Sequence, residues 1–262
     1  MEKLSIIIPA LNEATYLPEM LHALRSQTRL PDEIIVADAG STDGTPDIAK
    51  ARGAIVVPGG KPATGRNAGA KVATGDIFLF LDADVQPDPE FIERMLCEFT
   101  QSGYGVASCL MNTLDDTLIN RVIVEATNLC MRAIQPVTPH APGFCILVKR
   151  NIHCRIGGFD ESLQLSEDHD YVRRASRHGK FGLLTRIRIP VSLRRVEKEG
   201  LGGLVLKYLW CEVNILLNKP IHSLPFQYEF GMHRRRFVNR KIARRVLVWT
   251  RRIWTLAKLD EQ

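Results

Sequence analysis

The chain has 262 residues, of which 45% are hydrophobic and 24% charged, and it contains no low-complexity tract. This composition excludes a disordered or fibrous protein, and the length suits one sizeable α/β domain with an appendage. The six cysteines include no Cys-x-x-Cys pair and no zinc-ligand spacing. We therefore expect reduced thiols in a cytoplasmic protein.

The positive charge of the chain is concentrated in one segment. The net charge is +6 at pH 7, and residues 233–258 contain ten Lys or Arg and no Asp or Glu. Outside that segment 25 basic residues stand against 29 acidic ones, so the rest of the chain is net negative. This asymmetry predicts a polyanionic partner for the segment, either nucleic acid or an anionic membrane surface.

The first hundred residues alternate short apolar runs, rich in β-branched residues, with stretches of helical periodicity. The pattern predicts strands at 4–8, 33–37, 54–57 and 77–81, and helices at 16–27, 43–51 and 66–73. Such alternation is typical of a mostly parallel sheet with helices on both faces. Ligands of these sheets bind beyond the carboxyl ends of the strands, where polar clusters stand in this sequence.

The rest of the chain has a less regular pattern. It predicts helices at 88–102, 116–134 and 167–179, strands at 104–111 and 144–148, and a turn at 157–160. From about residue 200 the chain becomes an apolar and then a basic tail.

Two aspartates follow the strand predicted at 77–81. Asp82 and Asp84 stand two residues apart, and a turn after the strand lets both carboxylates face one site. Carboxylates bind hard cations such as Mg²⁺ and Mn²⁺, and two of them leave positions open for phosphate oxygens. A loop of solvated aspartates, favoured by Pro87 and Pro89, is the alternative interpretation.

Two other loops carry groups suited to a nucleotide. Asp38 opens the run Asp-Ala-Gly-Ser-Thr-Asp-Gly, where a carboxylate can accept from a uracil imide or a ribose hydroxyl. Arg66, near a helix start in Gly-Arg-Asn-Ala-Gly, can pair with a diphosphate through two hydrogen bonds. Taken alone, the first pattern also fits an ordinary loop and the second a surface arginine.

An acidic pair begins the helix predicted at 167–179. Glu167 and Asp168 lie in Ser-Glu-Asp-His-Asp-Tyr, and one of them can serve as the general base for an acceptor hydroxyl. Acidic residues in a first helical turn also interact favourably with the helix dipole, which is the simpler interpretation of this pair by itself.

Together, in their order and spacing, these segments resemble the family 2 glycosyltransferases. The match covers about residues 4–195, with every segment in the family's order. The matching segments are Pro9-Ala10-x-Asn12-Glu13, the Asp38 loop, Gly65-Arg66-Asn67, Leu81-Asp82-Ala83-Asp84, and Gly157-Gly158-Phe159-Asp160-Glu161 followed by Glu167-Asp168.

The resemblance implies the nucleotide-diphospho-sugar transferase fold, called GT-A, and inverting transfer of a sugar from a nucleotide-diphospho-sugar to an acceptor hydroxyl. A UDP-sugar is favoured. The resemblance further implies that Asp84 binds Mn²⁺ or Mg²⁺, that Asp82 contacts the metal or the ribose, and that Asp168 is the catalytic base. Glu167 then supports the acceptor, and the other implied contacts of the sugar donor are Pro9, Asn12, Glu13, Asp38 and Arg66.

An Arg-Arg pair follows the acidic helix. Arg194 and Arg195 are similar to a block in some bacterial family members, and we assign Arg195 to the sugar donor, although a surface basic pair fits equally well. The Gln-x-x-Arg-Trp motif of processive members is absent, which favours transfer of a single sugar. We expect a GT-A catalytic domain at 1–199, with a nucleotide-binding half (1–100) and an acceptor half (101–199), and a helical basic amphipathic tail at 200–262.

The tail has an amphipathic pattern. Apolar residues at 242, 246, 249, 253 and 256 share one helical stripe, and the arginines lie largely off it. We expect residues 233–258 to bind an anionic membrane, which suits a lipid or lipid-linked acceptor and a peripheral location at the inner face of the membrane. Packing on the catalytic domain or in a homo-oligomer is the alternative. Nucleic acid is not expected, because no stacking platform accompanies the arginines.

Two other functions share parts of the pattern. A nucleotidyltransferase of the same fold resembles its relatives in a glycine-rich first loop, whereas this loop reads Pro-Ala-Leu-Asn-Glu. A non-catalytic scaffold that binds a nucleotide sugar at the membrane would not need Asp82, Asp84 and Asp168, which are all present. The sequence identifies neither the sugar nor the acceptor.

Overall fold

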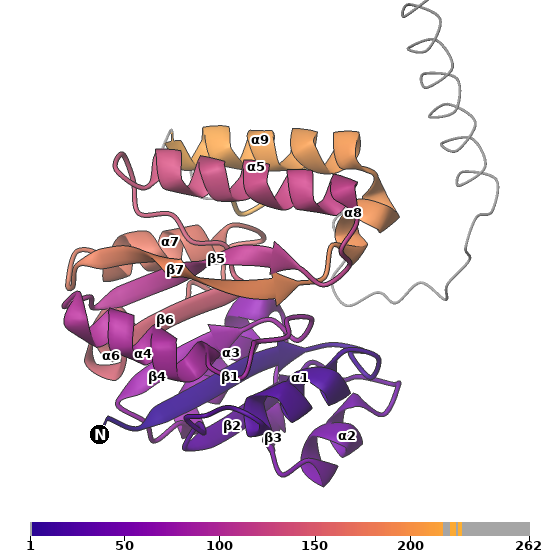
Figure 1. The fold of residues 1–262 in the computed structure, drawn as a ribbon, viewed down its shortest axis with the longest axis vertical. Coiled ribbons are helices and arrows are strands. Elements are labelled where there is room, and N and C mark those ends of the chain that lie inside the picture. The colour runs from indigo at the N-terminus through magenta and orange to yellow at the C-terminus, as the bar shows by residue number, and fades with distance from the viewer. Residues whose placement is uncertain (1, 217–220, 224, 227–262) are drawn as a thin grey trace, which may run out of the picture. The chain divides into compact units, whose positions relative to one another are not determined.

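A computed structural model describes residues 2–216, 221–223 and 225–226 of the chain. Its centre is a seven-stranded sheet in the order β3-β2-β1-β4-β6-β5-β7 (Figure 1). Neighbouring strands are parallel, except that β6 runs antiparallel to both β4 and β5. The strands are β1 (Leu4–Ala10), β2 (Glu33–Asp38), β3 (Ile55–Pro58), β4 (Ile77–Leu81), β5 (Val106–Thr113), β6 (Cys145–Lys149) and β7 (Phe181–Val191).

Helices flank the sheet, and the predicted α/β class with a mostly parallel sheet is confirmed. The described helices are α1 (Leu17–Arg25), α2 (Thr45–Ala51), α3 (Pro62–Val72), α4 (Phe91–Gln101), α5 (Leu118–Ile134), α6 (Arg150–Ile156), α7 (Glu167–Ala175), α8 (Arg194–Glu199) and α9 (Leu201–Leu216). The basic amphipathic stripe predicted at 242–256 lies outside the described residues. The domain division predicted at residue 199 stays a prediction.

Alternation of side chains along the buried strands builds a core on each face of the sheet. In β1, Ile6 packs in one apolar cluster with Leu21 of α1, whereas its neighbour Ile7 belongs to the cluster that contains Ala70 of α3 and Tyr171 of α7. Successive residues of a strand point to opposite faces, so a continuous apolar run is what a strand covered on both sides requires.

Helix α3 begins at Pro62, four residues earlier than the predicted start at 66. Pro62 suits a first helical turn because its fixed backbone angle is helical and its missing N–H needs no partner there. The glycines that weakened the helical pattern have a packing role. A Cβ on Gly69 would lie 2.5 Å from Cγ2 of Ile7, so only glycine lets α3 approach β1 this closely.

Strand β7 and helix α6 have no counterpart in the sequence prediction. The apolar pattern of β7 is interrupted by Arg186, Arg188 and Pro190, which resemble a loop. The strand lies at the edge of the sheet, where charged residues and proline are tolerated, and Arg188 forms an ion pair with Glu125 of α5. Tertiary position therefore overrides the local pattern in this segment.

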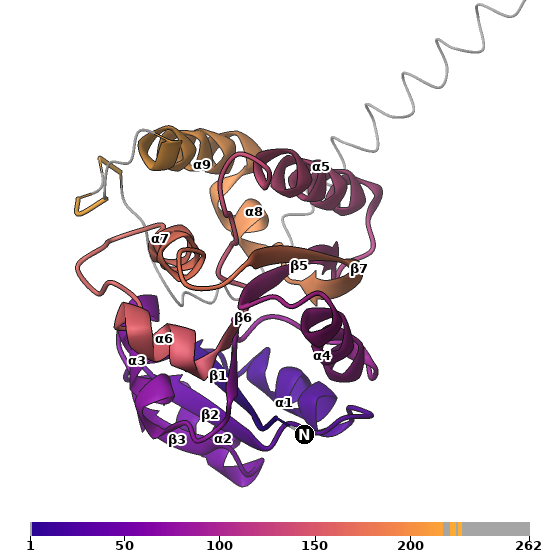
Figure 2. The same ribbon diagram turned by 90° about the vertical axis from the view of Figure 1, so that its left-hand side faces the viewer.

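Helices α5 and α9 lie side by side in an outer layer, and both views place α7 between this layer and the rest of the molecule (Figures 1 and 2). Cys211 of α9 packs with Leu165, which precedes α7, and with Ile221. No helix in the described part of the chain is both long and apolar enough to cross a bilayer.

Candidate active site

Arg66 joins the two halves of the chain at the carboxyl end of the sheet. Its guanidinium donates to Oε1 of Glu167 at 2.8 Å, to Oδ1 of Asp82 at 3.0 Å and to the carbonyl of Gly143 at 3.3 Å. Only 3% of the arginine side chain is exposed. Residues 16, 77 and 101 positions away in the sequence therefore meet at one buried cation.

The charges around Arg66 shift one another's ionisation. Burial by itself lowers the pKa of Arg66, but the carboxylates of Asp82, Glu167 and Asp168 outweigh it and raise that pKa. Burial raises the pKa of both Glu167 and Asp168, and the mutual repulsion of the pair raises that of Glu167 further. A carboxylate with a raised pKa is a stronger base, which suits proton transfer near neutral pH.

Asp168 is held by backbone groups and remains reachable. Its Oδ1 accepts from the N–H of His169 at 2.8 Å, and the backbone N–H of Gly143 also donates to the carboxylate. The side chain keeps 17% of its surface exposed. A Cβ on Gly143 would lie 2.6 Å from Nη2 of Arg66 and 3.2 Å from Oδ2 of Asp168, so this close approach requires glycine.

Two histidines stack beside the acidic pair. The rings of His140 and His169 lie 3.9 Å apart, and Nε2 of His169 lies 3.7 Å from Oδ1 of Asp168. Burial lowers the pKa of His140 to about 3 and that of His169 to about 4. Both rings are therefore neutral at pH 7 and do not neutralise the charge of Asp168.

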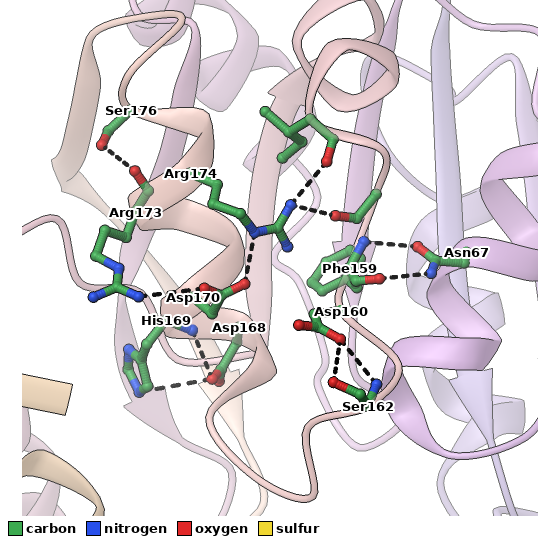
Figure 3. Close-up of polar contacts among 12 residues, drawn as sticks. Asn67, Phe159, Asp160, Ser162, Asp168, His169, Asp170, Arg173, Arg174 and Ser176 are labelled. Carbon is green, nitrogen blue, oxygen red and sulfur yellow. Dashed lines mark hydrogen bonds and ion pairs between the residues drawn. The ribbon is translucent and has the colours of Figure 1, made fainter. Parts of the chain in front are cut away.

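The turn before α7 is tied on both sides (Figure 3). Arg174 of α7 donates to the carbonyls of Ile156 and Gly158 at 3.0 and 2.8 Å and to Oδ2 of Asp170 at 2.6 Å. On the other side, Asn67 of α3 exchanges two hydrogen bonds with the backbone of Phe159, at 2.9 and 2.8 Å. These contacts fix α7, and hence Asp168, relative to the helix that carries Arg66.

Arg194 bridges two carboxylates from the first half of the chain. Its Nη1 and Nη2 donate to the two oxygens of Glu13 at 2.8 and 2.6 Å, and its Nε lies 2.9 Å from Oδ2 of Asp84. The guanidinium also lies over the ring of Tyr16, 4.8 Å from its centroid. These contacts bring α8 onto the loops that follow β1 and β4.

The same site holds an excess of buried negative charge. Burial raises the pKa of Asp84 to about 6, and Asp82 and Glu13 add to the increase while Arg194 opposes it. Burial likewise raises the pKa of Glu13. Hard carboxylate oxygens of this kind fit a divalent cation. No cluster of three or more His, Cys, Asp or Glu in the described part of the chain forms a complete metal site, so other ligands must come from a bound molecule.

The loop after β2 leaves one acceptor atom available. Oδ2 of Asp38 accepts from the N–H groups of Gly40 and Ser41, both at 3.0 Å, but its buried Oδ1 has no hydrogen-bond partner among the described residues. Asn12 links this loop to β1, because its backbone donates to Ser41 and its side chain accepts from the N–H of Thr42. Pro9, in contrast, faces α3, with its Cβ close to Gly65.

Residues 5–157 match the family model described as glycosyl transferase family 2. The chain belongs to this family. The resemblance inferred from the sequence is thereby confirmed, and this glycosyltransferase carries the expected order of motifs on the strands and helices described above.

Curated relatives of this glycosyltransferase include enzymes of lipid-linked sugar transfer. It is 32% identical over 159 residues to the undecaprenyl-phosphate 4-deoxy-4-formamido-L-arabinose transferase of Klebsiella pneumoniae strain 342, covering 54% of this chain and 46% of that one. It is 27% identical over 195 residues to an uncharacterized glycosyltransferase of Haemophilus influenzae, covering 68% and 63%. The chain thus spans about half the length of the first of these relatives.

Solved structures with the same fold include the mannosyltransferase PcManGT from Pyrobaculum calidifontis in complex with GDP-Man and Mn²⁺. Its TM-score is 0.59 at 23% identity, over 72% of this chain and 56% of that one. S. aureus TarS 1-349 in complex with UDP-GlcNAc has a TM-score of 0.57 at 21% identity, over 72% and 58%. At this identity the likeness establishes the fold of this glycosyltransferase.

The structure brings most of the predicted site residues together. Glu13, Arg66, Asp82, Asp84, Glu167 and Asp168 are linked by the contacts and charges described above, and their individual roles stay predictions. Of the two adjacent arginines, Arg194 reaches Glu13 and Asp84, whereas the sequence analysis assigned Arg195 to the sugar donor. Gly143 and the stacked histidines had no recognisable motif, because their contacts come from folding alone.

Proposed function

We propose that this glycosyltransferase moves a sugar from a nucleotide-diphospho-sugar, with a UDP-sugar favoured, to an oxygen carried on a lipid, with inversion at the anomeric carbon. The observation that carries the proposal is the buried Arg66, which joins Asp82 of the nucleotide half to Glu167 beside the base Asp168. A sugar held between these groups would have its leaving diphosphate and its attacking oxygen at adjacent parts of one site.

The first half of the chain supplies the contacts proposed for the nucleotide. The free Oδ1 of Asp38 can accept from the imide N–H of a uracil or from a ribose hydroxyl. The Asn12 side chain holds the loop that carries this carboxylate at the end of β2. Pro9 and Glu13 flank the same loops, and Arg66 supplies a buried positive charge toward the diphosphate.

Divalent metal is proposed to bind at Asp84 and Asp82, with diphosphate oxygens completing its ligands. A bound Mn²⁺ or Mg²⁺ would stabilise the negative charge that develops on the leaving diphosphate. Arg194 holds Asp84 and Glu13 when no substrate is bound, so metal and diphosphate must exchange with the guanidinium for these carboxylates. Arg194 then becomes able to pair with the diphosphate, a fork geometry that suits phosphate oxygens.

Asp168 is the proposed base. The acceptor oxygen attacks the anomeric carbon from the face opposite the diphosphate, the bond to the diphosphate breaks with its electron pair, and a hydroxyl proton passes to Asp168. Glu167 keeps Arg66 in place and orients the acceptor. The relatives that act on undecaprenyl phosphate favour a lipid phosphate as acceptor, and a hydroxyl of a lipid-linked glycan is the second candidate.

The test is turnover of the sugar donor by the full chain. The protein is incubated with UDP-, GDP- and dTDP-sugars, Mn²⁺ or Mg²⁺, and either polyprenyl phosphate or a membrane-lipid extract, while released nucleoside diphosphate is measured. We expect release from one donor that EDTA abolishes, together with a product of inverted configuration by NMR. Asp168→Asn should slow transfer to a hydroxyl acceptor by about 10²–10⁴-fold, and exposed Asp47→Asn is the matched control.

Other outcomes separate the alternatives. Pyrophosphate release from a nucleoside triphosphate would indicate a nucleotidyltransferase. Binding of a nucleotide sugar without transfer or hydrolysis would indicate a scaffold. Transfer to polyprenyl phosphate that Asp168→Asn leaves unchanged would assign a phosphate acceptor that needs no base.

A further inference from the structure

The outer layer formed by α5 and α9 has an unusual surface. Twelve large apolar side chains are exposed in the described part of the chain, and nine of them lie on α5, on the turn after it or on α9. The other three, Leu30, Ile55 and Val72, lie on separate elements. Scattered apolar residues are normal on protein surfaces, whereas a gathered set marks an interaction site.

The exposed residues share the outward side of the layer. On α5, the buried positions Val124, Asn128 and Met131 face the sheet, where Asn128 hydrogen-bonds the backbone of Met111 in both directions. The opposite side of α5 and the neighbouring part of α9 form what we call the α5–α9 face. Its main side chains are between 44% and 77% exposed and are Leu118, Ile119, Val122, Leu129, Val205 and Leu206.

This face lies on the acceptor side of the molecule. Figures 1 and 2 both place α7, which carries Asp168, under α9. The link is a small apolar cluster in which Cys211 of α9 packs with Leu165, three residues before Asp168. The backbone of Gln164 also donates to the carbonyl of Ile221 at 2.8 Å. A surface that binds α9 is therefore near the proposed base.

The charge of the chain indicates the occupant. Trp210 of α9 packs edge-to-face on Phe226, with ring centroids 5.5 Å apart, and the sequence beyond Phe226 contains ten Lys or Arg between residues 233 and 258. An apolar face followed in the chain by a cationic segment matches the surface of an anionic membrane, whose core accepts the apolar side chains and whose phosphates attract the basic ones.

We infer that the α5–α9 face docks on an anionic membrane, with its apolar side chains inserted among the lipid headgroups and Asp168 turned toward an acceptor carried on a lipid. The inference rests on the proposed lipid-borne acceptor for its biological sense. Its test measures binding and depth without any sugar transfer, so its failure and that of the proposed function are distinguishable.

Cys130 of α5 provides a reporter next to Leu129. It is exposed, as are Cys97 and Cys154 on α4 and α6, while the other three cysteines are buried. An environment-sensitive fluorophore is attached to Cys130 in a Cys97→Ser, Cys154→Ser chain, and to Cys97 in a Cys130→Ser, Cys154→Ser chain. Each is mixed with vesicles of equal parts phosphatidylcholine and phosphatidylglycerol. We expect a blue shift, and quenching by lipid-borne quenchers, at Cys130 and not at Cys97.

Paired substitutions test the apolar side chains themselves. Ile119→Asn with Leu129→Asn should weaken binding to the same vesicles by about tenfold, because two apolar side chains no longer leave water. Leu30→Asn with Val72→Asn removes equally exposed apolar groups elsewhere and should leave vesicle binding unchanged. Donor hydrolysis without lipid should match the unmodified chain in both variants, which shows that they fold.

Three outcomes would overturn the inference. The Cys130 label could stay unshifted although the chain binds vesicles, which would assign membrane binding to the basic segment alone. It could be blue-shifted before vesicles are added, which would mean that residues 227–262 or another protein surface cover the face. The chain could instead self-associate in light scattering and lose this with Ile119→Asn and Leu129→Asn, which would identify a dimer interface.

Discussion

Arg66 and Arg194 each hold carboxylates that come from distant parts of the chain. Arg66 pairs with Asp82 and Glu167, and Arg194 pairs with Glu13 and Asp84. Without a cation between them, these buried carboxylates would repel one another and take up protons. The two arginines therefore keep a strongly acidic site ionised and assembled before any substrate binds.

Removal of Arg194 should free the metal-binding carboxylates. We expect Arg194→Ala to raise the affinity for Mn²⁺ by about tenfold in the absence of a sugar donor, because Asp84 and Glu13 lose the cation that competes for them. Transfer should slow, since the guanidinium no longer reaches the diphosphate. Calorimetric titration with Mn²⁺ and donor turnover measure the two effects. The opposite assignment would be required if Arg195→Ala produced them and Arg194→Ala did not.

His153 should make the fold sensitive to acid. It is buried among aromatic rings with Nδ1 2.8 Å from the hydroxyl of Tyr171, and burial lowers its pKa from 6.5 to about 4. Below pH 6.5 the unfolded chain binds a proton that the folded chain does not, so stability falls as the pH falls from 6.5 toward 4. Relative to His153→Gln, the free energy of unfolding should drop by about 2 kcal/mol between pH 7.5 and pH 5. Urea titrations at the two pH values check this, and parallel losses in both proteins would contradict it.

At the scale of elements, the site depends on how closely helix α3 approaches the sheet. Gly65 and Gly69 place α3 against Pro9 and Ile7 of β1, and Arg66 lies between these two glycines. Asn67 of the same helix holds the turn before α7. One helix therefore sets the distance between the two halves of the site.

The same substitution should have opposite effects on two helices. Gly69→Ala adds a Cβ 2.5 Å from Ile7, and overpacking of this kind should destabilise the fold by about 1–3 kcal/mol, less the gain in helix propensity. At Gly203 of α9 a Cβ meets no atom within 4 Å, so Gly203→Ala should stabilise it by up to about 1 kcal/mol. Thermal unfolding of both variants decides, and an equal change in the two would show that helix propensity alone acts.

At the scale of the whole molecule, one sheet carries both halves of the site. The parallel strands β1, β2 and β4 end at the loops of Glu13, Asp38 and Asp82, and β4 pairs with the antiparallel β6. Through β6 the sheet continues to β5 and β7, after which Arg194 begins α8. Ligands that bridge the halves should therefore act on the stability of the entire sheet.

Binding of the sugar donor and metal should stabilise the fold cooperatively. At about 100 times the dissociation constant, a ligand that binds only the folded chain adds about 2.7 kcal/mol, or roughly 5–10 °C in Tm for a domain of this size. We expect this shift with Mn²⁺ and the correct nucleotide sugar together. EDTA or Asp84→Asn should remove most of it. A shift of the same size with EDTA present would argue against a metal at Asp84.

The amino-acid sequence by itself determined the α/β class, the position of most strands and helices, and the family. These features are written locally: β-branched apolar runs predict buried strands, and the order of Asp38, Arg66, Asp82 and Asp168 survives any change in the loops between them. Local patterns report how each segment is buried, which is why the edge strand β7, with its arginines, did not follow from them.

Only the tertiary structure decided which groups meet. It selected Arg194 over its neighbour Arg195, brought the backbone of Gly143 against Asp168, and gathered apolar side chains of α5 and α9 on one outer face. In sequence, the apolar residues of α5 look like any core-facing stripe, because periodicity shows that a helix has an apolar side and not what covers it. Contacts between residues a hundred or more positions apart depend on how helices pack on the sheet, and packing is a property of the whole chain.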